Sequence, residues 1–263
     1  MEFIKEVEFS SNLKNEIKQL TTQNKIVVIR NFENNDINPD EYKEIAKELG
    51  LFIYADENYK TGEFIPNVWT KVKYMKEHST NTYKHSNLAQ PIHTDYCYVP
   101  LLNMVLLICE EQAEYGGATT FIDGEDLYLY LKKYDENLLK SLETNYVSFG
   151  KGDNPIMKSK VKIITKNNAT GLVEVNWSKF RVSDDNSIEI HKMINTFDNF
   201  ISSYIERMGV LTPLMLKKGD AVFIQDNLVL HGRNSFIGNR CLLKAAIVTQ
   251  NIETAKEIFS KIF

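Results

Sequence analysis

The sequence predicts a mainly β fold with flanking helices and a double-stranded β-helix, or jelly-roll, core. Two observations lead to this prediction. Short strand-like segments separated by turn signals are interleaved with only a few helical segments, as in antiparallel double-sheet folds. The side chains best suited to bind a metal also belong to strands that are far apart in the chain, His93 and Asp95 on one and His231 on another. The open mouth of a jelly roll brings such side chains together.

The first fifty residues read as helix, strand and helix. Apolar residues recur every three or four positions over 12–20, which predicts a helix with a preceding serine as its cap. The β-branched segment 25–30 predicts a strand. A second helix is expected to begin near Pro39 and to end at Gly50. We expect these elements to form scaffold.

The next segments lead towards the candidate ligands. Residues 67–74 alternate imperfectly and predict a strand, and the polar loop around 85–87 is a candidate lid. The apolar run 104–110 predicts a buried strand. Asp123 is the expected N-cap of a helix over 125–133.

The second half of the chain predicts a hairpin, a long helix and a series of strands. The hairpin comprises 161–165 and 172–177, and the helix covers 187–208. A tail helix is expected over 252–263. The remaining strands are expected at 214–216, 221–225, 228–233 and 241–248. Because no repeat, low-complexity tract or proline-rich linker divides the chain, we expect one domain over residues 1–263.

The composition excludes several classes of partner. With 31 basic and 35 acidic side chains and a formal charge of −4, the chain lacks the basic blocks that bind nucleic acid or an anionic membrane. The run Met104–Cys109 is too short to span a bilayer, and the first residues lack the apolar core of a signal peptide. Three widely spaced cysteines do not form a disulfide framework, which favours free thiols in the cytoplasm. The oligomeric state is not readable from the sequence.

Chemistry is expected where His93, Asp95 and His231 meet. Residues two apart on a strand point to the same face, so His93 and Asp95 would present an imidazole and a carboxylate side by side. A second imidazole from His231 completes a set of two nitrogens and one oxygen. Such a facial set suits Fe(II) because it leaves coordination positions open for other ligands.

Further motifs follow in a fixed order. They are the form His-Thr-Asp-x-x-Tyr from His93, the turn Gly116-Gly117-Ala118-Thr119 that leads to Asp123-Gly124, and a C-terminal set with Gly219-Asp220, Asn227, His231-Gly232-Arg233 and Arg240. In this order they resemble the taurine dioxygenase superfamily of iron(II)- and 2-oxoglutarate-dependent oxygenases, and most closely its γ-butyrobetaine hydroxylase-like branch. The resemblance covers most of the chain, but residues 135–210 are unspecific.

The resemblance implies a role for each candidate residue. His93, Asp95 and His231 would bind Fe(II), with O2 and 2-oxoglutarate at the open positions. Arg240 would hold the distal carboxylate of 2-oxoglutarate, since a guanidinium offers two parallel hydrogen bonds. The other implied contacts are Thr119 with the same carboxylate, Arg233 with the cosubstrate or a carboxylate near the metal, and Lys244, Tyr96 and Tyr98 with the substrate. Asn227 is a candidate turn residue or support for the ligands.

The activity implied is hydroxylation of an unactivated C–H bond in a small amino-acid-like or anionic metabolite, with release of succinate and CO2. Desaturation, or an oxidative decarboxylation that forms an isonitrile, would use the same ligands and remains an alternative. Two other classes also remain open. One is a zinc hydrolase that uses the same three ligands, and the other is a non-catalytic barrel that binds a small ligand.

Overall fold

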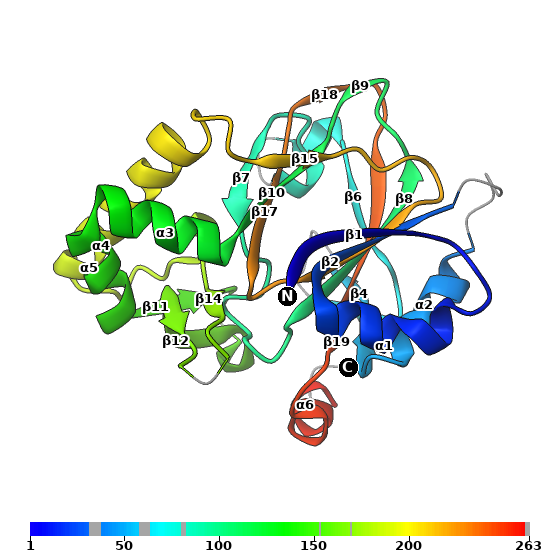
Figure 1. Ribbon diagram of the computed structural model, residues 1–263, viewed down its shortest axis with the longest axis horizontal. Helices are drawn as coiled ribbons and strands as arrows, with labels where there is room; N and C mark the ends of the chain where they lie inside the picture. The colour runs from blue at the N-terminus through cyan, green and yellow to red at the C-terminus, as the bar shows by residue number, and fades with distance from the viewer. Residues whose placement is uncertain (32–37, 58–63, 80–82, 153, 169, 261–263) are drawn as a thin grey trace.

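Two β-sheets packed face to face form the centre of the computed structural model (Figure 1). The structure describes residues 1–31, 38–57, 64–79, 83–152, 154–168 and 170–260. The larger sheet has the order β1 (Glu2–Glu8), β2 (Asn24–Arg30), β16 (Ala221–Gln225), β8 (Met104–Glu111), β19 (Cys241–Val248) and β3 (Leu51–Ile53), with β6 (Thr70–Lys73) also paired to β19. The smaller sheet has the order β15 (Thr212–Leu214), β10 (Thr119–Asp123), β17 (Val229–Arg233) and β7 (Gln90–His93). The predicted jelly-roll core is therefore confirmed.

Six helices and four two-stranded ribbons surround this core in the part of the chain that the structure describes. The helices are α1 (Leu13–Gln23), α2 (Pro39–Lys47), α3 (Gly124–Tyr134), α4 (Glu136–Thr144), α5 (Ile188–Phe200) and α6 (Ile252–Phe259). The ribbons pair β4 (Ala55–Glu57) with β5 (Phe64–Pro66), β9 (Tyr115–Gly116) with β18 (Phe236–Ile237), β11 (Tyr146–Gly150) with β12 (Lys158–Lys162), and β13 (Ile164–Lys166) with β14 (Val173–Val175). No described helix has the length and apolar character needed to cross a membrane.

The larger sheet is buried on both faces, because alternate residues of its strands enter different hydrophobic clusters. On β2, Val27 and Ile29 pack against α1 and α2, while Ile26 and Val28 face the smaller sheet. On β19, Leu242 also faces the smaller sheet. Since the side-chain period of a strand is two residues, Lys244 projects from β19 into the same space between the sheets.

The smaller sheet follows the same rule. On β17, Val229 belongs to the cluster between the sheets and Leu230 to the cluster under the helices. His231 and Arg233 share the parity of Val229, so both project into the barrel. On β7, Ile92 packs under the helices, which turns His93 inward. The interior of the barrel mouth therefore receives polar side chains from both sheets.

Helices α3, α4 and α5 cover the outer face of the smaller sheet and lie together on the left of Figure 1. Their cluster includes Trp177, whose ring meets Phe197 edge-on at a centroid distance of 4.8 Å. Lys25, which is 1% exposed, lies on β2 of the larger sheet and forms an ion pair of 2.7 Å with Asp123, the last residue of β10 in the smaller sheet. Asp123 caps α3 as predicted, accepting from the Glu125 N–H at 2.8 Å.

Several predicted boundaries were wrong. Asn12, not a serine, occupies the N-cap of α1, and its side chain makes no capping hydrogen bond. The strand predicted over 67–74 is only β6, because Asn67 has a positive φ of 61°. The strand expected at 214–216 lies two residues earlier, as β15. The long helix is α5 followed by a π-helical turn, Ile201–Ile205, and the last three residues of the tail helix lie outside the described residues.

Candidate metal centre

His93 and His231 occupy facing positions on adjacent antiparallel strands. They are register partners in the pairing of β7 with β17, and their ring centroids are 4.7 Å apart. The register shifts between His231 and Arg233, which is paired with Gln90. At this shift the chains approach closely, because a Cβ on Gly232 would lie 2.6 Å from the Gln90 carbonyl oxygen. Only glycine therefore fits between His231 and Arg233.

Asp95 reaches the same place without belonging to a strand. β7 ends at His93, and Thr94 leaves the sheet to bond with Trp177 through the main chain at 2.6 Å and through its hydroxyl, which accepts from the Trp177 N–H at 3.0 Å. The predicted alternation of His93 and Asp95 along a strand was therefore wrong, although the two side chains still meet. The N–H of Asp95 donates instead to the carboxylate of Asp226, at 2.9 Å.

The three side chains form one cluster. Asp95 Oδ1 lies 3.6 Å from His93 Nε2, and Asp95 Oδ2 lies 3.4 Å from His231 Nε2. One ligand atom from each residue lies within 4.8 Å of the others. Burial opposes ionisation of Asp95, but the Lys244 ammonium and the two imidazoles hold the pKa of this carboxyl well below its ordinary value. Burial lowers the pKa of His231, which keeps an imidazole lone pair available.

Two further polar side chains contact the cluster. Lys244 Nζ lies 2.5 Å from Asp95 Oδ1 and 5.1 Å from the ring centroid of Tyr96. Gln90 Nε2 lies 3.2 Å from His93 Nε2, while His93 Nδ1 lies 2.9 Å from the carbonyl of Pro91. An amide, an ammonium and a tyrosine ring therefore border the side on which a metal would bind.

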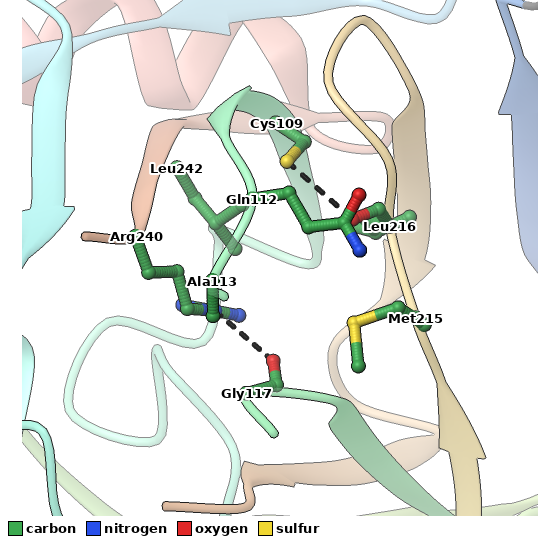
Figure 2. A pocket seen from close by; sticks show the side chains of 8 residues that line it. All are labelled: Cys109, Gln112, Ala113, Gly117, Met215, Leu216, Arg240 and Leu242. Atoms are coloured by element: carbon green, nitrogen blue, oxygen red, sulfur yellow. Dashed lines mark hydrogen bonds between the residues drawn. The ribbon is translucent and has the colours of Figure 1, made fainter. Parts of the chain in front are cut away.

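Arg240 and Thr119, to which the resemblance assigns the same carboxylate of 2-oxoglutarate, contact one another. Arg240 Nη2 donates to Thr119 Oγ1 at 3.4 Å, and Arg240 Nε donates to the carbonyl of Gly117 at 3.0 Å. Figure 2 shows the small cavity on whose wall Arg240 and Gly117 lie, opposite Met215. Because Gly117 belongs to the glycine turn before β10, this turn positions the guanidinium of Arg240 through the Gly117 carbonyl.

Arg233 is a second buried guanidinium beside Arg240. Its Nη2 donates to the carbonyls of Ser86 and Leu88, both at 2.7 Å, and its Nε is buried without a hydrogen-bond partner among the described residues. Among the described ion pairs neither arginine faces a carboxylate, so of the two contacts expected for Arg233 the one with the cosubstrate stays a prediction. Burial lowers the pKa of both groups to about 10, with a further contribution at Arg233 from the charge of Arg240.

Residues 85–87, the candidate lid, are held in place by hydrogen bonds to neighbouring segments. His85 is fully buried, with Nδ1 2.9 Å from the Lys73 carbonyl. The Asn87 carbonyl accepts from the Phe236 N–H at 3.0 Å, and the Ser86 carbonyl accepts from Arg233. These contacts make residues 83–88 a wall of the barrel mouth.

The remaining candidates lie apart from the cluster or were missed. Tyr98 is buried in the hydrophobic cluster under the helices, with Arg181 5.2 Å from its ring centroid, which favours a packing role. Asn227 lies in the turn before β17, where its carbonyl accepts from the Val175 N–H. Sequence reasoning passed over Gln90 and Asp226. The signal for Asp226 was an acidic residue in the turn between two apolar segments, five positions before His231.

The donor set fits a ferrous ion. Two imidazole nitrogens and one carboxylate on a single face match the ligands of non-haem Fe(II) oxygenases and leave the opposite positions free. The two arginines without carboxylate partners nearby fit an anionic ligand, because a buried charge without a partner is costly.

Comparisons with known proteins agree with this geometry. A family model described as "Taurine catabolism dioxygenase TauD, TfdA family" matches residues 3–246. No curated protein matches the sequence.

Several solved structures share the fold at low sequence identity. The non-heme iron oxygenase OrfP, in complex with Fe and α-ketoglutaric acid, is 14% identical with a TM-score of 0.67, over 94% of this chain and 82% of that one. An asparagine oxygenase in complex with Fe(II), 2S,3S-3-hydroxyasparagine and succinate is 8% identical with a TM-score of 0.68, over 92% and 80%. A putative α-ketoglutarate-dependent taurine dioxygenase from Burkholderia xenovorans is 13% identical with a TM-score of 0.63, over 94% and 87%.

Proposed function

This chain belongs to the TauD/TfdA family and is an Fe(II)- and 2-oxoglutarate-dependent dioxygenase, and we propose that it hydroxylates an unactivated C–H bond of a small amino-acid-like or anionic metabolite. Succinate and CO2 are the other products. The observation that carries the proposal is the meeting of His93, Asp95 and His231 from distant parts of the chain.

In this proposal His93 and His231 bind Fe(II) through Nε2, and Asp95 binds it through one carboxylate oxygen. Bound Fe(II) supplies the activation of O2 that unactivated C–H bonds require. The chain's own part is to hold the three ligands on one face and to exclude water from the barrel mouth. The low pKa of Asp95 favours the ionised form that metal binding needs.

The cosubstrate is placed against Arg240, Thr119 and Arg233. Arg240 holds the distal carboxylate of 2-oxoglutarate, and the Thr119 hydroxyl adds a hydrogen bond. Arg233 contributes positive charge and its Nε–H, which has no partner among the described residues. Two neighbouring buried cations that have no carboxylate partner among the described residues support this placement, because a dicarboxylate would compensate both.

The substrate is assigned to Lys244 and Tyr96, which lie beside Asp95. Lys244 offers a cation for an anionic group, and Tyr96 offers an aromatic face; Tyr98 contributes from behind as a packing residue. The OrfP and asparagine oxygenase structures contain (3S)-hydroxy-L-Arg and 3-hydroxyasparagine, which supports an amino-acid-like substrate. The resemblance of the forms His-Thr-Asp-x-x-Tyr and Gly-Gly-x-Thr to the γ-butyrobetaine hydroxylase-like branch supports membership of that branch as part of the proposal. A cytoplasmic location, supported by three buried free cysteines, completes the proposal.

Anaerobic addition of Fe(II) and 2-oxoglutarate tests the proposal. A visible metal-to-ligand charge-transfer band should appear, be lost in Asp95→Ala and weaken in Arg240→Ala. A folded wild-type protein that gives no band would contradict it. A screen of amino acids, amines and N-acyl amino acids for substrate-dependent succinate formation then identifies the substrate, and mass spectrometry of the product separates hydroxylation from desaturation or decarboxylation.

A further inference from the structure

We infer that Asp226 is a positioning residue that fixes the metal ligand Asp95 by binding its backbone, so that the hairpin which carries His231 organises all three ligands. This inference rests on the proposed function. Asp226 is 2% exposed and lies in the turn between β16 and β17.

The two histidines do not need such help. His93 and His231 are register partners in one antiparallel pair, so the hydrogen bonds between β7 and β17 set the distance between their Cα atoms. Asp95 lies beyond the end of β7 and has no strand partner. Something outside the sheet must therefore fix its main chain.

Asp226 supplies that constraint with both carboxylate oxygens. Oδ1 accepts from the Asp95 N–H and Oδ2 from the Tyr96 N–H, each at 2.9 Å. Two successive amides bound by one carboxyl group have little freedom to rotate. Lys244 contacts Asp95 through its side chain and not through its main chain, so it does not replace these hydrogen bonds.

The same carboxyl group also lies beside His231, without a hydrogen bond to its ring. Asp226 Oδ1 lies 3.8 Å from His231 Nδ1, beside the ring edge that points away from Asp95. The Asp226 N–H donates to the Asn103 carbonyl at 3.0 Å, which anchors the turn against the residue preceding β8. One buried side chain thus touches the peptide of one ligand and lies beside the imidazole of another. Supports of this kind orient ligands and tune metal affinity.

Asp226→Asn is the direct test, because it keeps the volume but places an N–H2 group against a backbone N–H. Co(II) serves as an oxygen-stable probe, with its dissociation constant measured by chelator competition and its visible absorption spectrum recorded. We expect Co(II) to bind about 10- to 100-fold more weakly than to the wild type, with a changed spectrum. Hydrogen exchange of a peptide that contains Asp95 and Tyr96 should also become faster in the metal-free protein.

Asp220→Asn is the matched control. Asp220 is likewise buried, and its carboxylate accepts from the N–H groups of Asn31 and Lys217 and pairs with Arg30. We expect this variant to lower the thermal stability and to leave the Co(II) affinity and spectrum at wild-type values. If Asp226→Asn does not fold by circular dichroism, Asp226→Ser, which keeps one small acceptor, takes its place.

The outcomes separate two failures. Wild-type Co(II) affinity and spectrum in the folded Asp226 variant, or an equal loss in the Asp220 control, would overturn the positioning role alone. A wild-type protein that binds neither Co(II) nor Fe(II) would overturn the proposed function and this inference with it.

Discussion

Lys244, on β19 of the larger sheet, forms an ion pair of 2.5 Å with Asp95, which follows β7 of the smaller sheet. The pair lies beside the two histidines of the metal cluster. The ammonium, together with the imidazoles, holds the Asp95 carboxyl in its ionised form despite burial. The barrel mouth therefore presents an ionised carboxylate that can bind a metal cation and, beside it, an ammonium that can bind an anionic group.

Loss of one metal ligand should abolish stabilisation by metal. At a Co(II) concentration about 100 times the dissociation constant, binding should raise the wild-type melting temperature by about 5–11 °C. His231→Ala should show no such rise in melting temperature, because only two of the three metal ligands remain. Differential scanning fluorimetry with and without Co(II) measures this. His191→Ala, on the surface of α5, is the control, and an equal rise in His231→Ala would exclude His231 as a ligand.

Arg240→Lys should bind 2-oxoglutarate poorly although it keeps the charge. Lysine cannot form the two parallel hydrogen bonds of a guanidinium, and the loss of a charged hydrogen bond costs about 1.5–3 kcal/mol, or about 10- to 150-fold in affinity. Titration of the charge-transfer band with 2-oxoglutarate gives the affinity. Thr119→Val should cost only about 0.5–1.5 kcal/mol; a larger effect for Thr119 than for Arg240 would reverse the assigned roles.

Gly232→Ala should destabilise the protein, because its Cβ would lie 2.6 Å from the Gln90 carbonyl oxygen. Strand β7 must then move away from β17, at a cost of about 1–3 kcal/mol. Urea unfolding followed by circular dichroism measures the free energy of unfolding. Gly150→Ala is the control, since the nearest atom to its Cβ would be the Ser183 hydroxyl oxygen at 3.2 Å, on a side chain that can move. Equal stability of the two variants would contradict the close approach.

Lys25→Met should also destabilise the protein. Lys25 is 1% exposed and binds both carboxylate oxygens of Asp123, at 2.7 and 2.9 Å. Removing one partner of a buried ion pair costs about 3–5 kcal/mol. The double variant Lys25→Met/Asp123→Asn keeps a helix-capping side chain without a charge and should recover part of the loss. No recovery in a urea titration would show that the charge of Asp123 is not the cause.

The three cysteines should resist alkylation in the folded protein. Burial raises the pKa of Cys109 and Cys241 to about 12 and that of Cys97 well above its ordinary value. A raised thiol pKa lowers the thiolate fraction, so at pH 8 only about one Cys109 thiol in ten thousand would be ionised. Mass spectrometry after iodoacetamide treatment should show no modification until guanidinium chloride is added. Rapid labelling of the native protein would contradict this burial.

The strands of the core were predictable because their residues carry strong local signals. Segments such as 221–225 and 241–248 are largely apolar, and each follows a glycine turn; such runs fit strands buried on both faces. The N-cap of α3 was predictable for the same local reason, since Asp123 precedes a helical pattern.

The path of the chain at Asp95 was not predictable, because a distant contact decides it. Alternation along a strand would have continued through Asp95, but Thr94 bonds to Trp177, which lies 83 positions away in the sequence. The fastening of residues 83–88 depends in the same way on Arg233 and Phe236. The predicted convergence of the ligands was observed even so, while the reason given for it, a shared strand face, was wrong.

The close fit of β7 against Gly232 has a consequence for how this protein could be redesigned. The two histidines are set by the backbone pairing of β17 with the edge strand β7, whereas Lys244, Tyr96 and Gln90 reach the metal cluster through their side chains. Exchanging Tyr96 would alter which substrate enters and leave the pairing of the two histidines in place, whereas exchanging Lys244 or Gln90 would also remove a contact to Asp95 or His93. Attempts to change the substrate specificity should therefore begin with Tyr96 and leave the hairpin that bears His231 unchanged.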